Sequence, residues 1–188
     1  MRELTDAKVI ESVRKGNQSD FEILVDRYKN KAFSLLCNML KDNMEAEEVL
    51  QDAFLKAYYG LNNFKQEAKF STWFYRIVYN TALTRLSAKK RKIEKEMTSI
   101  DEDLNILDNT YPADSEKKEL SLLLTELIDK LPPNYASVIT MFYLEEMSCE
   151  EISEVTNRSI SNVKVLLHRS RNALKDIVLK SNYTLEML

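Results

Sequence analysis

The sequence contains very little glycine, proline, cysteine or histidine. Its 188 residues include two Gly, three Pro, two Cys and one His. Folds built from strands and turns need Gly and Pro where the chain reverses, so this scarcity argues against an all-β fold. Gly16 and Gly60 are too far apart to build a phosphate-binding loop of the G-x-G-x-x-G or Walker A type.

The sequence also gives little support for a metal site, a disulfide or a membrane segment. Cys37, Cys149 and His168 are widely separated, so no cluster has the spacing of zinc ligands and no disulfide framework is expected. The first residues are charged throughout, unlike a signal peptide, and no apolar run approaches the roughly 18 residues of a membrane span. We therefore expect a soluble, cytoplasmic chain that is not inserted in a membrane and uses no metal or other cofactor.

Apolar residues recur every three to four positions along most of the chain, which predicts an all-α fold. Capping signals mark three of the helix starts. These signals are Ser19 with Glu22, Ser71 or Thr72, and Ser148 with Glu151. The predicted helices cover residues 6–15, 21–39, 46–60, 71–88, 120–131, 135–142, 148–155 and 161–179.

One stretch of the chain lacks this helical periodicity. A basic run at 89–92 is followed by acidic residues, by Pro112 and by a loss of apolar periodicity over 96–118. This composition is typical of a flexible acidic linker. The sequence therefore predicts two small helical domains, residues 1–95 and 119–180, joined by the linker at 96–118. Residues 181–188 form a tail.

The second predicted domain carries the pattern of a helix-turn-helix. A short acidic helix is followed by a turn of about four residues and a longer basic helix, which suits a helix that enters a DNA groove. A solvated basic helix end would explain the cations equally well, since cations suit the helix C-terminus. The capped first helix and the short turn favour DNA binding. The residues expected to face outward are Ser161, Asn162, Lys164, Val165, His168 and Arg169.

The first predicted domain combines a polar stripe with many aromatic residues. Arg76, Asn80 and Thr84 are four residues apart, and Phe70, Trp73 and further rings lie between and before them. Cations interleaved with aromatics suit melted nucleic acid, where bases stack on rings. Taken alone, the pattern favours rings that pack in the core and a stripe that faces solvent. The acidic helix at 46–58 is either an ordinary amphipathic helix or a docking face for a basic partner helix.

Four blocks of sequence, in order and correctly spaced, resemble one family. The blocks are residues 46–58; residue 64 with 70–80; residues 131–135; and residues 151–155 with 162–164 and 167–171. They are similar to conserved blocks of bacterial RNA polymerase sigma factors of the extracytoplasmic-function (ECF) group, in the sigma-70 family. The similarity runs from about residue 5 to residue 180.

The resemblance implies a dissociable subunit that directs RNA polymerase core to promoters and initiates transcription. Such a chain is not an enzyme and has no small-molecule substrate. The first domain would bind the β′ clamp helices and open the −10 element of promoter DNA. The second would bind the β flap and read the −35 duplex. Family members are commonly restrained by an anti-sigma factor, which is often membrane-bound.

The resemblance also assigns residues to each role. Those implied to bind the polymerase clamp are Glu48, Leu50, Gln51, Asp52, Phe54 and Leu55. Those implied to read and melt the −10 element are Asn63, Phe64, Phe70, Ser71, Trp73, Arg76, Asn80 and Thr84, with the loop 61–70 holding a flipped base. Those implied to contact the −35 element are Ser161, Asn162, Lys164, Val165, His168, Arg169 and Arg171.

The sequence departs from the family pattern around the helix-turn-helix. Asn157 occupies the turn position that usually holds Gly, and Asn tolerates a positive φ better than most residues. Asn162 replaces a usual Thr. Val165 and Leu166 replace a usual Ser-Arg pair, so one cation expected to bind phosphate is missing. The resemblance therefore does not predict which −35 sequence this chain recognises.

Three other functions are alternatives to the sigma-factor interpretation. A stand-alone helix-turn-helix regulator, independent of polymerase, would explain residues 148–174 but not the block at 46–58. An enzyme is disfavoured because the sequence shows no nucleophile–base pair, metal cluster or phosphate loop. A degenerate sigma-like protein that only binds a regulator is a further alternative.

Overall fold

The computed structural model describes residues 4–96 and 124–180, and all regular structure in these two ranges is helical. The elements are α1 (Asp6–Arg14), η1 (Gln18–Asp20), α2 (Phe21–Leu40), α3 (Asn43–Gly60), η2 (Leu61–Asn63), α4 (Phe70–Glu96), a helical stretch at 124–129, α6 (Pro133–Ile139), the π-helix η3 (Thr140–Leu144), α7 (Cys149–Thr156) and α8 (Ile160–Lys180). The predicted all-α class is confirmed. Residues 97–118 of the predicted linker and the tail at 181–188 lie outside the described residues, so the domain boundaries stay predictions.

The capping prediction is confirmed at α7 and wrong at α2. The Ser148 hydroxyl accepts a hydrogen bond from the Glu151 N–H at 3.1 Å, and the Glu151 carboxylate accepts one from the Ser148 N–H at 2.9 Å. At α2 the N-cap is Asp20, and Ser19 lies within the 3-10 turn that leads into the helix. An N-cap residue normally has extended backbone. Because Asp20 is already helical (φ −65°, ψ −17°), the box between Ser19 and Glu22 does not form.

The long helix α4 begins earlier and ends later than its sequence predicts. It begins at Phe70, so neither Ser71 nor Thr72 stands at the N-cap position. The Trp73 N–H donates to the Lys69 carbonyl at 3.2 Å, which brings Lys69 into the first turn. At its other end α4 continues to Glu96 and includes the basic run at 89–92, which the sequence placed after the helix.

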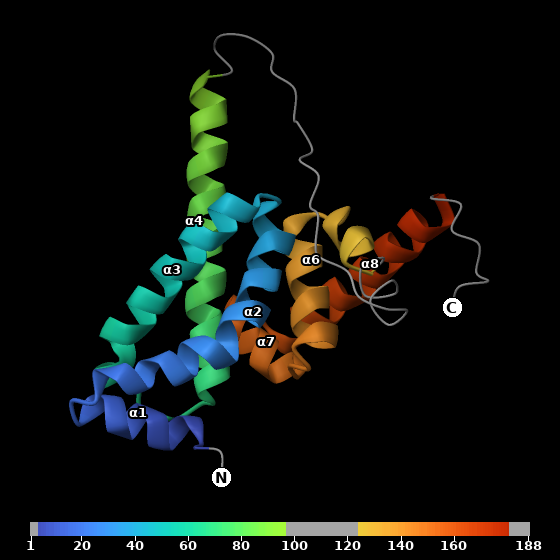
Figure 1. Cartoon of the computed structure of the whole chain (residues 1–188). Coiled ribbons are helices and arrows are strands. Elements are labelled where there is room, and N and C mark those ends of the chain that lie inside the picture. The colour runs from blue at the N-terminus through green and yellow to red at the C-terminus, as the bar shows by residue number, and fades with distance from the viewer. Residues whose placement is uncertain (1–3, 97–123, 181–188) are drawn as a thin grey trace, which may run out of the picture.

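The first domain, defined here as residues 4–96, packs α1 to α4 together (Figure 1). Aromatic rings are buried between these helices. Phe74 of α4 is completely buried. Its ring stacks on Phe54 of α3 with centroids 4.6 Å apart and lies parallel to Phe70 at 5.9 Å. Tyr28 of α2 approaches both Phe70 and Phe74. These rings therefore hold α2, α3 and α4 in one bundle.

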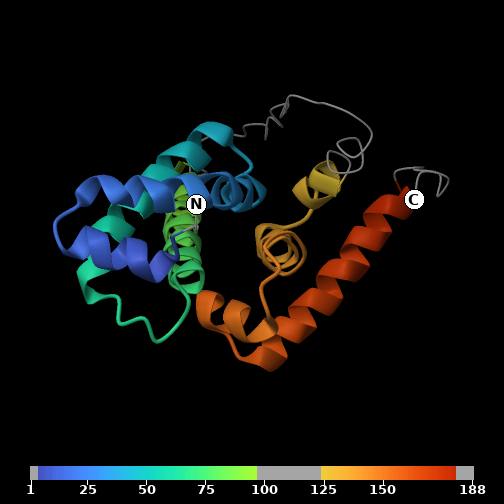
Figure 2. The ribbon, with the colours of Figure 1, turned by 60° about the horizontal axis from the view of Figure 1, so that its bottom comes forward.

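The second domain, defined here as residues 124–180, contains the predicted helix-turn-helix. Helices α7 and α8 meet at a sharp angle (Figure 2). The chain turns between them through Asn157, whose backbone is left-handed (φ 52°, ψ 42°) and whose N–H donates to the Ser153 carbonyl. Asparagine is one of the few side chains that tolerate this conformation. The turn therefore forms without the glycine that the family usually carries.

The two domains pack directly against each other. Helix α7 lies along α4, and α6 and η3 lie along α2 (Figures 1 and 2). One continuous cluster of buried apolar side chains includes residues of both domains. The sequence predicted two domains connected by a tether and contained no sign of this contact.

We expect Asn157→Val to lower the free energy of unfolding by about 1–2 kcal/mol, because a β-branched side chain is strained in left-handed backbone. Asn157→Gly relieves that strain and should be as stable as the parent chain or slightly more so. Urea denaturation of the three proteins measures this difference. Equal stability of the Val and Gly variants would contradict the assigned backbone conformation.

Candidate nucleic-acid interface

A polar stripe runs along the exposed side of α4. Arg76, Asn80 and Thr84 are all exposed and follow one another at one-turn intervals. The Thr84 hydroxyl donates to the Asn80 carbonyl at 2.9 Å, which satisfies the hydroxyl within the helix. Arg76 and Asn80 therefore offer the main donors of this stripe to a ligand.

The aromatic rings beside the stripe divide into one surface ring and several supporting rings. Trp73 is half-buried, and its indole packs on Phe64 with centroids 4.8 Å apart. Phe64 and Phe70 are only 6% and 4% exposed. Both rings belong to the core in the described arrangement, and their contact with DNA stays a prediction. Trp73 is the ring that lies beside the stripe and reaches the surface.

The loop after α3 is held by an arginine that the sequence analysis missed. Arg14 of α1 donates to the Leu61 carbonyl at 2.7 and 3.1 Å and also to the Phe64 carbonyl. At the start of this loop, a Cβ added to Gly60 would lie 3.2 Å from the Trp73 indole. Arg14 of α1 and Gly60 at the start of the loop therefore both shape it. No sequence signal pointed to Arg14, since its partners are 47 and 50 residues away.

The loop and the stripe face the helix-turn-helix across one cavity of about 810 Å³. Asn63, Trp73 and Arg76 line it on the first domain, and the turn 157–159 lines it on the second. The cleft is open rather than enclosed, and residues of both domains line it.

The outward face of α8 agrees with its sequence prediction. All seven residues assigned to −35 contact are exposed: Ser161, Asn162, Lys164, Val165, His168, Arg169 and Arg171. Leu166, which replaces a usual cation, is 9% exposed and belongs to the core, whereas Val165 is 46% exposed. Asn172 contacts the His168 ring at 3.2 Å. The residues of α8 assigned to the −35 element thus present polar groups and the apolar side chain of Val165 to solvent.

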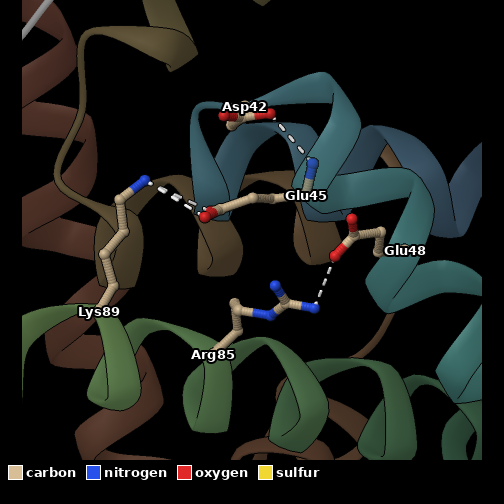
Figure 3. A network of polar contacts seen from close by, with 5 residues as sticks. All are labelled: Asp42, Glu45, Glu48, Arg85 and Lys89. Carbon is tan, nitrogen blue, oxygen red and sulfur yellow. Dashed lines mark hydrogen bonds and ion pairs between the residues drawn. The ribbon is translucent and has the colours of Figure 1, made fainter. Parts of the chain in front are cut away.

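A second exposed surface lies on α3, and its acidic residues pair with cations of α4 (Figure 3). Glu48 pairs with Arg85 at 2.9 Å, and Glu45 pairs with Lys89 at 3.4 Å. The Asp42 carboxylate caps α3 by accepting the Glu45 N–H at 3.0 Å. Exposed ion pairs of this kind contribute about 0–1 kcal/mol each, so a partner can displace them at little cost.

The polymerase-binding residues implied by the resemblance do not all share this surface. Gln51, Asp52 and Leu55 are exposed, as is Glu48, and Leu50 is half-buried. Phe54 is 8% exposed and stacks on Phe74, so its ring is part of the core here and its contact with polymerase stays a prediction.

Two exposed apolar residues of α3 were missed by the sequence analysis. Met44 is 79% exposed and Tyr59 is 75% exposed. Both fall outside the helical repeat of the buried residues Ala46, Val49 and Ala53. Their positions in the sequence therefore already indicated that they face away from the core. Together with Leu55, they give α3 an apolar surface next to its acidic one.

The described residues contain no helix that is both long and apolar enough to cross a membrane. Within residues 4–96 and 124–180, no group of three or more His, Cys, Asp or Glu side chains is placed to hold a metal ion.

Comparison with known families matches the chain in two places. The family model for Sigma-70 region 2 matches residues 24–92. The family model for Sigma-70, region 4 matches residues 121–174. The first match covers α2 to α4, and the second covers the helix-turn-helix.

Curated relatives and solved structures agree with these matches. The chain is 37% identical over 181 residues to the ECF RNA polymerase sigma factor SigW of Bacillus subtilis (strain 168), covering 92% of this chain and 96% of that protein. It is 32% identical over 181 residues to the ECF RNA polymerase sigma-E factor of Haemophilus influenzae, covering 93% of this chain and 95% of that protein. The sigma factor RpoE, solved with the anti-sigma factor NepR from Bartonella quintana, has the same fold, with a TM-score of 0.68 at 17% identity over 87% of this chain and 98% of that one.

Two sigma-70 regions thus occupy the two helical domains in order, and the similarity to full-length relatives extends over more than nine-tenths of the chain. The chain belongs to the ECF group of RNA polymerase sigma factors.

Proposed function

We propose that this chain binds RNA polymerase core, reads the −35 duplex with α8 and opens the −10 element with α4 and the loop before it. The observation that carries the proposal is the exposure of two separate nucleic-acid surfaces, one on each domain, in a chain that matches both sigma-70 regions. Bond-making chemistry belongs to the polymerase, and this chain supplies binding energy only.

Helix α8 has the groups needed for groove reading. Lys164 and Arg169 are exposed cations that suit phosphates, and Asn162 and His168 offer donors and acceptors to base edges. The exposed Val165 suits the methyl group of a thymine, which is an apolar feature of the major groove. Replacing the usual cation by a core leucine transfers phosphate anchoring to the remaining basic residues.

Strand opening depends on Trp73 and the α4 stripe. Unstacking a base costs a few kcal/mol, and stacking on an aromatic ring returns about 1–3 kcal/mol per base. Trp73 offers such a ring, Arg76 offers a cation to the strand, and Asn80 offers an amide to a base edge. Phe64 and Phe70 hold Trp73 in place from beneath, and Arg14 fixes the loop that would hold a flipped base.

The partners follow from the same surfaces. Exposed acids and apolar side chains on α3 suit a basic, partly apolar helix pair such as the β′ clamp helices. The second domain would bind the β flap. Solved relatives are described as complexes with an anti-sigma factor and with the cytosolic domain of CnrY. We infer a restraining partner of that kind for this chain and a cytoplasmic site of action.

The test of this function is run-off transcription with purified polymerase core on fragmented genomic DNA, with and without the chain. New start sites that share a paired upstream motif would support the proposal. A stand-alone regulator would bind DNA but would neither bind core nor produce new starts. The match of residues 24–92 to Sigma-70 region 2 argues against that alternative.

Leu55→Ala and Phe54→Ala form a matched pair on α3. Phe54→Ala should destabilise the fold by about 3–5 kcal/mol, because it empties the stack on Phe74. Leu55→Ala should change stability by less than about 0.5 kcal/mol, because the side chain is exposed. Leu55→Ala should instead weaken binding to polymerase core about tenfold in a titration. Unchanged core affinity would remove Leu55 from the docking surface.

Asn80→Ala should reduce open-complex formation about tenfold, the loss of one good polar contact. Permanganate footprinting of melted thymines, at a promoter found by run-off transcription, measures this loss. Asn30→Ala is the control, because Asn30 is an exposed helical asparagine on α2. If both variants melt the promoter as the parent does, Asn80 does not contact the opened strand.

Lys164→Ala should reduce the dependence of log affinity on log salt by about one unit, because one phosphate contact is lost. Binding of holoenzyme to promoter DNA across a salt series gives the slope. Lys180→Ala is the control, since Lys180 lies about 24 Å further along α8 and is also exposed. An equal change in both variants would contradict the assigned contact face.

A further inference from the structure

Helix α8 divides into a buried side, an uncharged outer line and two charged flanks. The buried side is formed by residues that are at most 9% exposed, namely Val163, Leu166, Leu167 and Ser170. An α-helix advances about 100° around its axis per residue, so the direction of every other residue follows from these four. Four exposed residues point away from the core, about 150–170° from the centre of the buried side. This outer line consists of Ser161, Val165, His168 and Asn172.

Cations lie on both flanks of the outer line. Lys164 and Arg171 lie roughly 90–110° from the centre of the buried side in one direction, and Arg169 lies about as far in the other. The Arg171 guanidinium lies over the Tyr143 ring, 5.9 Å from its centroid, which favours its place on the flank. A helix in the major groove has a phosphate backbone on each side and base edges in front of it. The flanks of α8 therefore suit phosphates, and its outer line suits bases.

Val165 is the apolar member of the outer line. Its side chain is 46% exposed and lies between Ser161 and His168, about one turn from each. The Asn172 amide contacts Nε2 of the His168 ring at 3.2 Å, which orients the ring next to Val165. Covering an exposed valine with an apolar group removes both from water, which is favourable. The apolar group that the major groove presents is the C5 methyl of thymine.

We propose that Val165 is a specificity-determining residue, which packs on the C5 methyl group of one thymine in the duplex that α8 reads. The polar members of the outer line select base edges by hydrogen bonds, and Val165 adds a requirement for a methyl group. The serine that the family usually carries at this position would offer a hydroxyl instead. This role rests on the part of the proposed function in which α8 reads duplex DNA, and it does not depend on polymerase binding.

Replacing thymidine by deoxyuridine tests the methyl group alone. Deoxyuridine keeps the pairing with adenine and the O4 acceptor in the major groove, and it lacks only the C5 methyl. Duplexes of random sequence, enriched on the full chain both alone and with polymerase core, give the recognised sequence. Each thymine of that sequence is then replaced singly by deoxyuridine, and the affinity of each duplex is measured by fluorescence anisotropy.

One thymine of the recognised sequence should be sensitive to the loss of its methyl group. Its replacement should weaken binding of the parent chain about fourfold, which corresponds to one methyl group left in water. Val165→Ser should bind the thymine and deoxyuridine duplexes within about 1.5-fold of each other. Leu179→Ser is the control, because Leu179 is 63% exposed and lies about 21 Å further along α8. This control should keep the loss of about fourfold.

Methylated cytosine provides a second measurement at the sensitive position. A C·G pair in place of the T·A pair should weaken binding, because it removes the methyl group and changes the polar groups in the groove. The base 5-methylcytosine carries a methyl group on the same ring carbon as thymine. It should therefore recover about fourfold in affinity over cytosine with the parent chain, and no more than about 1.5-fold with Val165→Ser.

Equal losses in the parent chain and in Val165→Ser, or no loss above about twofold at any thymine, would overturn the role of Val165. A recognised sequence without thymine, or no enriched sequence with or without core, would overturn it as well. A methyl-sensitive duplex together with failed run-off transcription would refute the promoter function and leave the role of Val165 intact. Successful run-off transcription without methyl sensitivity would refute the role of Val165 alone.

Discussion

The stack of Phe54, Phe74 and Phe70 is the interaction on which the arrangement of the first domain depends. Phe74 lies completely buried between rings from α3 and from the start of α4. This stack sets how α3 lies against α4, and their outer faces carry the two surfaces proposed to bind polymerase and the opened strand. The acidic and apolar face of α3 and the polar stripe of α4 are therefore positioned relative to each other by the same core.

The two proposed DNA surfaces depend on contacts of different range in the sequence. Helix α8 needs only a capped partner helix and a left-handed Asn157 to present its outward residues. The single-strand surface needs more, because Trp73 rests on Phe64 and the loop is held by Arg14 from α1. The contact between the two domains adds neighbours to this surface, since Glu151 pairs with Lys69 and the turn 157–159 lines the same cleft.

The electrostatics also fall into two classes. The pairs of Glu48 with Arg85 and of Glu45 with Lys89 are solvent-accessible and weak, which suits a surface that exchanges partners. Glu145 is nearly buried, and losing Lys31 and Tyr75 would leave an unpaired charge. Surface pairs can therefore be replaced one at a time, whereas the Glu145 carboxylate needs both of its partners.

The sequence alone was sufficient for the helices, the helix-turn-helix and the family, because these depend on local periodicity, caps and contiguous motifs. It was also sufficient for the outward face of α8, where Val163, Leu166 and Leu167 recur at helical spacing and face the core. It could not separate Phe54 from Leu55, or Phe64 from Trp73, because neighbouring apolar residues compete for one core and only packing decides between them. The role of Arg14, the hydrogen bond between Asn38 and Thr140, and the packing of the two domains on each other were decided by the tertiary structure, because contacts across tens of residues leave no local pattern.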